Sequence, residues 1–219
     1  VECYLPACLN SIMNATKRLK SVEIICVNDG STDGSGAIID HFCRKNKAFR
    51  AVHKENRGYG HAVNVGISLS QAEYVTIVES DDVITGTPYE NLIHVLDSDP
   101  DLAFVKTSYL IWEEGKIRSV VRLNSESLRR ETVPYRPTPS QIADCRIFND
   151  FTESELVFMA PSIWSAVYRK AVLDQKNITV IETPGASHQD TYFSNLLFLN
   201  GLKHAYIDRP YYLYRYERP

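Results

Sequence analysis

The sequence predicts an α/β protein whose mostly parallel sheet is flanked by helices. Between residues 21 and 78, runs rich in β-branched residues alternate with helical patterns, in the order strand, helix, strand, helix, strand. Two of these runs, residues 21–27 and 74–78, are followed directly by acidic and turn-forming residues. Ligands bind beyond the carboxyl ends of strands in such sheets, so these observations also predict a site at that edge.

The composition is that of an ordinary globular protein. Hydrophobic residues make up 44% of the 219 residues, enough for a sizeable core, and the net charge is −3. No basic stripe argues for nucleic-acid binding. The five cysteines form no C-x-x-C pair and predict reduced thiols in a cytoplasmic protein. No apolar run reaches the length of a membrane span, and no signal peptide is expected.

Elements of the first half are predicted from the spacing of their apolar residues and from the turn residues between them. Leu5, Leu9 and Ile12, for example, follow a helical period. The predicted helices are residues 3–18, 37–43, 61–69 and 88–97. The predicted strands are residues 21–27, 49–53, 74–78 and 102–110.

The second half is predicted to be less regular. Residues 111–123 form a predicted hairpin that turns at residues 113–116. The stretch 124–155 holds three of the ten prolines and many charges, so loops and short helices are expected there. Beyond it, helices are expected at residues 169–175 and 188–200, and strands at residues 162–168, 203–207 and 211–216.

An acidic cluster follows the strand predicted at residues 74–78. That strand carries no charge and is expected to be buried on both faces, and it leads into Glu79, Ser80, Asp81 and Asp82. Carboxylates so close together repel one another unless a cation or ligand hydroxyls satisfy them. Mg²⁺ takes oxygen ligands and often bridges carboxylates to phosphates. The alternative interpretation is an acidic turn that caps the following helix.

Two further aspartates stand where they could act on a ligand. Asp29 follows its strand, so it is expected at the same edge of the sheet as the acidic cluster. A carboxylate there can accept the imide N–H of uracil. Asp190 opens the helix predicted at 188–200, where it could serve as a general base. The alternatives are a turn aspartate at position 29 and a helix-capping aspartate at position 190.

The glycines match neither of two familiar phosphate-binding motifs. Gly58 and Gly60 are followed by Val63 where the dinucleotide fingerprint needs a third glycine. No Gly-Lys-Ser or Gly-Lys-Thr ending marks a P-loop. The glycines at positions 30, 34 and 36 fit turns as well as they fit ligand binding.

Five short motifs stand in order along residues 1–110. They are Tyr4-Leu5-x-x-Cys8-Leu9-x-Ser11-Ile12, Val27-Asn28-Asp29-Gly30-Ser31-Thr32-Asp33-Gly34-Ser35, Asn56-x-Gly58, Asn64-x-Gly66-Ile67 and Glu79-Ser80-Asp81-Asp82. This ordered set resembles the bacterial family 2 glycosyltransferases, which have the GT-A fold with a Rossmann-like sheet. Residues 184–193 are similar to the second acidic motif of that family and extend the resemblance to about residue 216.

The resemblance implies how a nucleotide-sugar donor would be bound. Asp29 would contact the uracil of a UDP-sugar, and Gly58 and Asn64 would be substrate-binding residues. Glu79 would take the first acidic position of the D-x-D motif, near the ribose and the diphosphate.

The resemblance also implies the chemistry. Asp81 would be a ligand of Mg²⁺ or Mn²⁺, which offsets the charge that develops on the diphosphate leaving group. Asp190 would be the catalytic base that removes the proton from the acceptor hydroxyl as it attacks. Such enzymes transfer a sugar with inversion at the anomeric carbon, and no covalent intermediate is needed.

Four departures from the family pattern accompany the resemblance. The family opens with a strand and a Pro-x-Tyr-Asn loop, and this chain starts just after that point, so an upstream strand is expected. Glu79 replaces an aspartate, Val63 replaces an arginine, and Gln189 replaces a glutamate. Arg57 or His61 could supply the contact of the replaced arginine.

Three functions fit these observations. The first is a metal-dependent, inverting glycosyltransferase that moves a sugar from a UDP-sugar to a glycan or lipid-linked acceptor, in the synthesis of a cell-surface polysaccharide. Residues 1–110 would form its nucleotide-sugar-binding half, and residues 111–219 its acceptor-binding half. The second is a catalytically inactive nucleotide-sugar-binding module, and the third is a nucleotidyltransferase. The protein is expected in the cytoplasm, either free or in peripheral contact with the inner face of the membrane.

Overall fold

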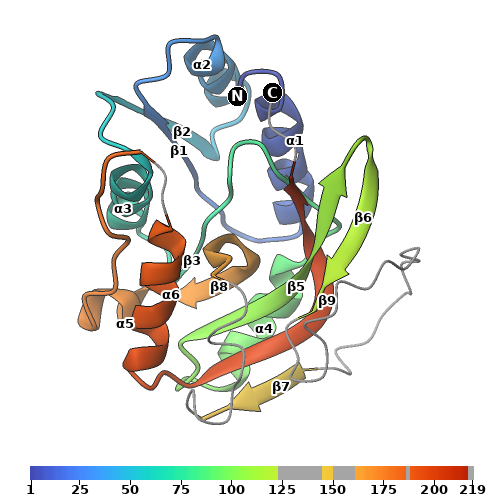
Figure 1. The fold of residues 1–219 in the computed structure, drawn as a ribbon, viewed down its shortest axis with the longest axis vertical. Helices are drawn as coiled ribbons and strands as arrows, with labels where there is room; N and C mark the ends of the chain where they lie inside the picture. Colours follow the sequence, from blue (N-terminus) through green and yellow to red (C-terminus); the bar gives the residue numbers. More distant parts are fainter. Residues whose placement is uncertain (123–144, 150–160, 186–187, 217–219) are drawn as a thin grey trace.

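The computed structural model describes residues 1–219 except 123–144, 150–160, 186–187 and 217–219 (Figure 1). The helices expected from the sequence in this part of the chain are present, with ends within two residues of the predicted ones. The helices are α1 (Leu5–Thr16), α2 (Ser35–Lys45), α3 (Tyr59–Leu69), α4 (Tyr89–Ser98), α5 (Lys170–Gln175) and α6 (Gln189–Leu199). The apolar spacing that predicts them therefore matches faces that the fold buries.

The strands form two sheets. They are β1 (Ile24–Asp29), β2 (Phe49–Lys54), β3 (Tyr74–Thr76), β4 (Val83–Ile84), β5 (Phe104–Glu113), β6 (Lys116–Val121), β7 (Cys145–Phe148), β8 (Ala166–Arg169) and β9 (His204–Arg215). β1 and β2 pair in parallel, and the larger sheet has the order β3-β8-β5-β9-β4, with β6 added to β5 and β7 to β9. In the larger sheet the β5–β9 pair is parallel and the other pairs are antiparallel.

The sheet is thus mixed, whereas the sequence predicts a mostly parallel one. The strand–helix–strand pattern correctly indicates the parallel β1–β2 unit and its helices. The antiparallel pairs come from the second half, where β6 follows β5 through the predicted hairpin and β8 enters between β3 and β5. A period-2 pattern alone does not specify which way a strand runs beside a neighbour distant in sequence.

The strand predicted at residues 74–78 is shorter and less buried than expected. β3 ends at Thr76, which is exposed, and β3 pairs with β8 but not with β1. A groove of about 250 Å³ lies between β1 and β3, lined by both strands and by apolar residues of α1.

Two further predictions of strands are wrong in detail. Residues 203–207 and 211–216 belong to one strand, β9, whose register with β5 shifts opposite Pro210. Proline lacks a backbone N–H, so the ladder is interrupted there without ending the strand. The strand predicted at residues 162–168 begins as a 3₁₀ turn, η3 (Ile163–Ser165), and β8 starts only at Ala166.

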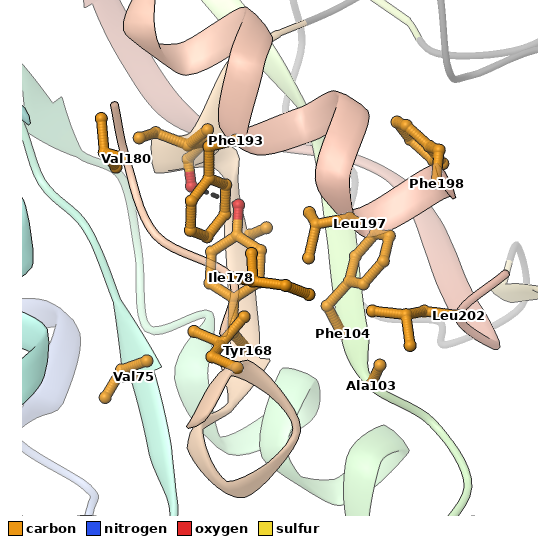
Figure 2. Packing of buried hydrophobic residues seen from close by; sticks show 13 residues of the cluster. Val75, Ala103, Phe104, Tyr168, Ile178, Val180, Phe193, Leu197, Phe198 and Leu202 are labelled. Carbon is orange, nitrogen blue, oxygen red and sulfur yellow. Dashed lines mark hydrogen bonds between the residues drawn. The ribbon is translucent and has the colours of Figure 1, made fainter. Parts of the chain in front are cut away.

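The core lies on both faces of the larger sheet. Phe104 of β5 belongs to a cluster with α5 and α6, whereas the next residue, Val105, belongs to a cluster with α4. Figure 2 shows the first cluster, in which Tyr168 of β8 lies between Val75 of β3 and Phe193 of α6. A smaller cluster joins α1 and α2 to β1. The helix that is predicted to carry the catalytic base, α6, therefore packs directly against the sheet.

All five cysteines are free thiols, as the sequence predicts. Within the described residues, no helix is long and apolar enough to cross a membrane. A groove of about 670 Å³ lies between α1 and α2, and none of the predicted site residues lines it.

Candidate active site

Asp29, the last residue of β1, holds the loop that leads into α3. Its carboxylate accepts the backbone N–H groups of Arg57 at 3.0 Å and Gly58 at 2.8 Å and pairs with the ammonium of Lys54. Burial alone would raise the pKa of the Asp29 carboxyl, but the hydrogen bonds that it accepts hold the pKa below its usual range. Asp29 is therefore an anionic acceptor at the carboxyl end of β1, where the sequence predicts it.

The acidic loop after β3 is joined to the start of α3. The hydroxyl of Tyr59 donates to Glu79 Oε1 at 2.6 Å. Burial raises the pKa of the Tyr59 hydroxyl, and the charge of Glu79 raises it further, so the phenol keeps its proton and remains the donor. On the other side of the loop, the backbone N–H of Glu79 donates to the hydroxyl of Tyr212 in β9 at 3.0 Å.

Asp82 is anchored inside the protein rather than presented at the surface. It is 1% exposed, and its Oδ1 accepts the backbone N–H of Arg215 at 2.7 Å. The side chain of Arg215 donates from Nε to the carbonyl of Asp81 at 3.0 Å and lies over the ring of Tyr4. The end of β9 thus fixes the acidic loop and leaves the side chain of Asp81 half-buried.

Asp190 lies in the first turn of α6. Its carboxylate is half-buried, and Oδ1 accepts the N–H of Thr191 at 2.8 Å. The helix begins after His188, which has the left-handed φ of 54°. The N-terminal end of α6 places Asp190 close enough to Tyr59 for its charge to raise the pKa of the phenol.

These contacts bring three predicted site residues together around the N-terminus of α3. Asp29 binds the N–H of Gly58, and the next residue, Tyr59, binds Glu79 and experiences the charge of Asp190. The three carboxylates come from β1, from the loop after β3 and from α6, which are far apart in the sequence. The structure therefore assembles one acidic site from separate segments.

The acidic loop fits a cation only in combination with ligand oxygens. Within the described ranges, no three His, Cys, Asp or Glu side chains are arranged to hold a metal ion by themselves. Burial raises the pKa of Asp82 to about 7, and the charges of Asp81 and Glu79 contribute to this. Such repulsion favours a cation, and Mg²⁺ is commonly held by one or two carboxylates together with phosphate oxygens and water.

The other predicted donor-binding residues have contacts within the protein. Gly58 has a φ of 90° and gives its N–H to Asp29. Asn64 bonds through its amide to Val180 and Glu182. Arg57 is one of the two residues that could supply the contact of the arginine that Val63 replaces. Its guanidinium pairs with the carboxylate of Glu182, with 3.8 Å between Nη2 and Oε2.

Sequence reasoning misses the residues that hold the acidic loop. Tyr59 lies between two glycines, and Tyr212 and Arg215 lie in a segment that the sequence predicts only as a strand. Their partners are 20 to 133 residues away in the sequence, so no local pattern marks them. Tyr168 of β8, by contrast, belongs to the core and is 1% exposed.

Comparison with known proteins shows the family of this chain. Residues 1–156 match the family described as Glycosyl transferase family 2, which is more than half of the chain. The chain belongs to glycosyl transferase family 2. This family 2 chain is 28% identical over 221 residues to Glycosyltransferase GlyA of Streptococcus pneumoniae, covering 100% of the chain and 29% of GlyA. It is 25% identical over 215 residues to the putative glycosyltransferase EpsH of Bacillus subtilis, covering 98% of the chain and 57% of EpsH.

Solved structures confirm the GT-A fold of this family 2 chain. A crystal structure of S. aureus TarS, residues 1–349, in complex with UDP-GlcNAc matches it with a TM-score of 0.76 at 20% identity. The match covers 100% of this chain and 56% of the TarS chain. The family 2 chain thus spans between 29% and 57% of the length of these relatives.

Proposed function

We propose that this chain carries the donor and base site of an inverting glycosyltransferase that uses a UDP-sugar and a divalent cation. The observation that carries the proposal is the position of Tyr59, which binds Glu79, follows the glycine held by Asp29, and experiences the charge of Asp190. A donor-binding carboxylate, the acidic loop and a base are thereby within one site. The acceptor is a glycan or lipid-linked hydroxyl of a cell-surface polysaccharide pathway.

The donor side of the proposal is supported by the state of Asp29. Its carboxylate stays ionised and is held in place by the loop at residues 54–58, so it can accept the imide N–H of uracil. The TarS structure with the same fold binds UDP-GlcNAc. A uridine nucleotide is therefore the donor class that we propose.

Asp81 would hold the divalent cation, with Glu79 near the same diphosphate. When bound, the cation offsets the negative charge of the leaving diphosphate. Within the chain, Arg215 fixes the backbone at Asp81 through its carbonyl, and Tyr59 orients the carboxylate of Glu79. These contacts hold the loop in place before the donor arrives, which lowers the cost of ordering it.

Asp190 would act as the base. It lies in the first turn of α6, where the helix dipole favours a carboxylate, and as the base it would take a proton from the acceptor hydroxyl. The hydroxyl oxygen then forms the new bond to the anomeric carbon as the bond to the diphosphate breaks. The proton ends on Asp190, and inversion follows from attack on the opposite face.

The alternative is a catalytically inactive module that binds nucleotide sugars. The glutamate at position 79 favours it, because one extra methylene shifts the carboxylate relative to an aspartate. A panel of UDP-, GDP- and TDP-sugars with Mn²⁺ or Mg²⁺, read by thermal shift and by release of free nucleotide, separates the two. We expect stabilisation and release with a UDP-sugar. Stabilisation without release would identify the inactive module, and no response to any uridine sugar would contradict both.

A further inference from the structure

The segment between α5 and α6 crosses α3, as the orange chain beside the teal helix in Figure 1 shows. Asn64 of α3 holds this segment with its side-chain amide. Its Oδ1 accepts the N–H of Val180 at 2.9 Å, and its Nδ2 donates to the carbonyl of Val180 at 2.8 Å and to Glu182 Oε1 at 3.0 Å. Both backbone groups of Val180 are thus paired with a single side chain of the donor half.

Two glycines let residues 180–185 lie directly against the first turn of α3. A Cβ atom on Gly60 would stand 2.2 Å from the carbonyl oxygen of Ile181, and a Cβ atom on Gly58 would stand 3.0 Å from that of Thr183. Real Cβ atoms do not approach backbone oxygen so closely as the first of these distances. The contact between the segment and α3 is therefore backbone against backbone, with little freedom to shift.

Gln189 holds the other end of the same segment. It is 2% exposed, and its Nε2 donates to Thr183 Oγ1 at 2.9 Å and to the carbonyl of Gly185 at 3.0 Å. Gln189 is the first residue of α6 and directly precedes Asp190. An ionised glutamate at this position could still accept from the hydroxyl of Thr183, but it would set an oxygen against the carbonyl oxygen of Gly185, so the bond to Gly185 needs the amide.

The same segment is tied to α6 through the core. Val180 and Phe193 are both buried members of the cluster drawn in Figure 2. Phe193 lies three residues after Asp190, on the next turn of α6. Because Asn64 holds Val180, and Val180 packs in the same cluster as α6, a shift of Val180 would change the packing of the helix that contains Asp190.

We propose that Asn64 and Gln189 are positioning residues that hold residues 180–185 between α3 and α6 and thereby place the carboxylate of Asp190 where it meets the attacking acceptor hydroxyl. The inference rests on the proposed function, because it takes Asp190 as the base. It replaces the expectation that Asn64 binds the donor itself. A misplacement of about 1 Å can lower a rate by about 100-fold, so even a small shift of the segment should be visible in turnover.

The first test separates positioning from donor binding. Asn64→Ala and Gln189→Met are compared with the wild-type chain for the Kd of UDP-GlcNAc with Mn²⁺, measured by calorimetry, and for the kcat of UDP release. We expect Kd to stay within about twofold and kcat to fall by about tenfold or more. The double variant should lose less than the product of the two single losses, because both act through one segment.

Two control variants match these changes. The first is Ser68→Ala, at a residue one turn after Asn64 on α3. The second is Asn200→Ala, at the residue that follows the last residue of α6. Both side chains bond to carbonyls of their own helices. We expect neither change to alter kcat. If Asn64→Ala instead weakened UDP-GlcNAc binding and left kcat at saturating donor unchanged, Asn64 would be a donor ligand and the positioning role would be overturned.

The second test does not depend on activity. Hydrogen exchange is measured in the ligand-free protein for peptides that cover residues 176–185 and 189–199. Asn64→Ala should raise exchange in both by about tenfold, whereas Ser68→Ala should raise it in neither. Unchanged exchange at residues 189–199 in both Asn64→Ala and Gln189→Met would reject the link to α6. If the wild-type chain bound no nucleotide sugar, the proposed function would fail while this structural link could still be confirmed or rejected.

Discussion

The hydroxyl of Tyr59 donates a 2.6 Å hydrogen bond to Glu79 Oε1, which joins the first residue of α3 to the acidic loop after β3. Because Asp29 holds the residue before Tyr59, this single bond connects the two strand ends that the sequence predicts as a donor site. It also orients the carboxylate of Glu79, which the resemblance predicts in the first acidic position of the D-x-D motif.

Tyr59→Phe removes that bond and leaves the ring in place. The carboxylate of Glu79 then loses a donor in a half-buried position, a change of about 1.5 to 3 kcal/mol for a bond to a charged group. We expect the Kd of a UDP-sugar with Mn²⁺ to rise by about tenfold in calorimetry. Tyr192→Phe, on the exposed side of α6, is the control and should bind normally. Equal affinities for the two variants would remove Tyr59 from the donor site.

Asp190→Asn keeps the shape of the side chain and removes its ability to take a proton. We expect transfer to fall by about 100-fold or more while UDP-sugar binding survives, because the base acts on the acceptor and not on the donor. Turnover and donor Kd are measured on the same preparation. Turnover close to that of the wild-type chain would contradict the role of Asp190.

Asp81→Asn tests the proposed cation site. With Mn²⁺ present, the variant should bind a UDP-sugar more weakly than the wild-type chain, because Asp81 would hold the cation that offsets the charge of the diphosphate, and an asparagine would hold it less tightly. With EDTA, both proteins should bind the donor equally weakly. Asp33→Asn, on the loop before α2, is a matched control whose response to Mn²⁺ should be normal. Donor binding that is insensitive to EDTA in the wild-type chain would exclude a metal role for Asp81.

Replacement by alanine should change the free energy of unfolding in opposite directions at two glycines of α3. Gly60→Ala would force its Cβ against the carbonyl of Ile181 and should lower the free energy of unfolding by about 1 to 3 kcal/mol. Gly66→Ala would meet only Val27 Cγ2 at 3.6 Å and should raise it by about 0.5 to 1 kcal/mol, because alanine restricts the unfolded chain. Urea unfolding of both variants decides the matter. Equal effects would show that the segment can move away from α3.

Because Lys106 of β5 is buried, we expect the free energy of unfolding to depend on pH. It is 4% exposed, and burial lowers the pKa of its ammonium group to about 7, an effect that the charge of Asp190 partly offsets. Between about pH 7 and about pH 10 the unfolded chain therefore binds more protons at Lys106 than the folded chain does. The free energy of unfolding rises with pH in this window and loses this contribution as pH falls to 7.

Lys106→Met should remove that rise. The difference between the unfolding free energies of the wild-type chain and the variant should shift by about 2 to 3 kcal/mol in favour of the wild type from about pH 7 to about pH 9. Urea titrations at the two pH values measure it. Lys203→Met, at a lysine paired with Asp99, is the control and should show no such shift. A constant difference for Lys106→Met would mean that its amine keeps a proton when folded.

The helices could be predicted from the sequence because each carries an apolar face with a helical period, as Leu5 and Leu9 do in α1. The ends of strands followed by acidic residues likewise predicted that Asp29 and Glu79 approach one site. The direction of β8 and the continuity of β9 could not be predicted, because both depend on pairing with β5 across more than 50 residues. Local patterns fix which residues face a core, but not which strand lies beside which.

Among the site residues, too, some could be predicted from local sequence and others could not. Asp29 and Asp190 stand out in sequence because a carboxylate after a strand or at the start of a helix has a recognisable physical setting. Asn64 stands out only through the resemblance, and its observed bonds are to Val180, 116 residues away. No period or composition signal marks such a contact.

The anchoring of the acidic loop by Arg215 has a practical consequence for work with shortened proteins. The residues that match the family end at 156, yet the backbone carbonyl of Asp81 and the carboxylate of Asp82 both accept hydrogen bonds from Arg215 of β9. A fragment trimmed to the matching region would keep Asp29 and the acidic loop at residues 79–82 but lose Arg215, which holds that loop. Loss of activity in such a fragment would therefore say nothing about whether the intact site can bind a sugar nucleotide.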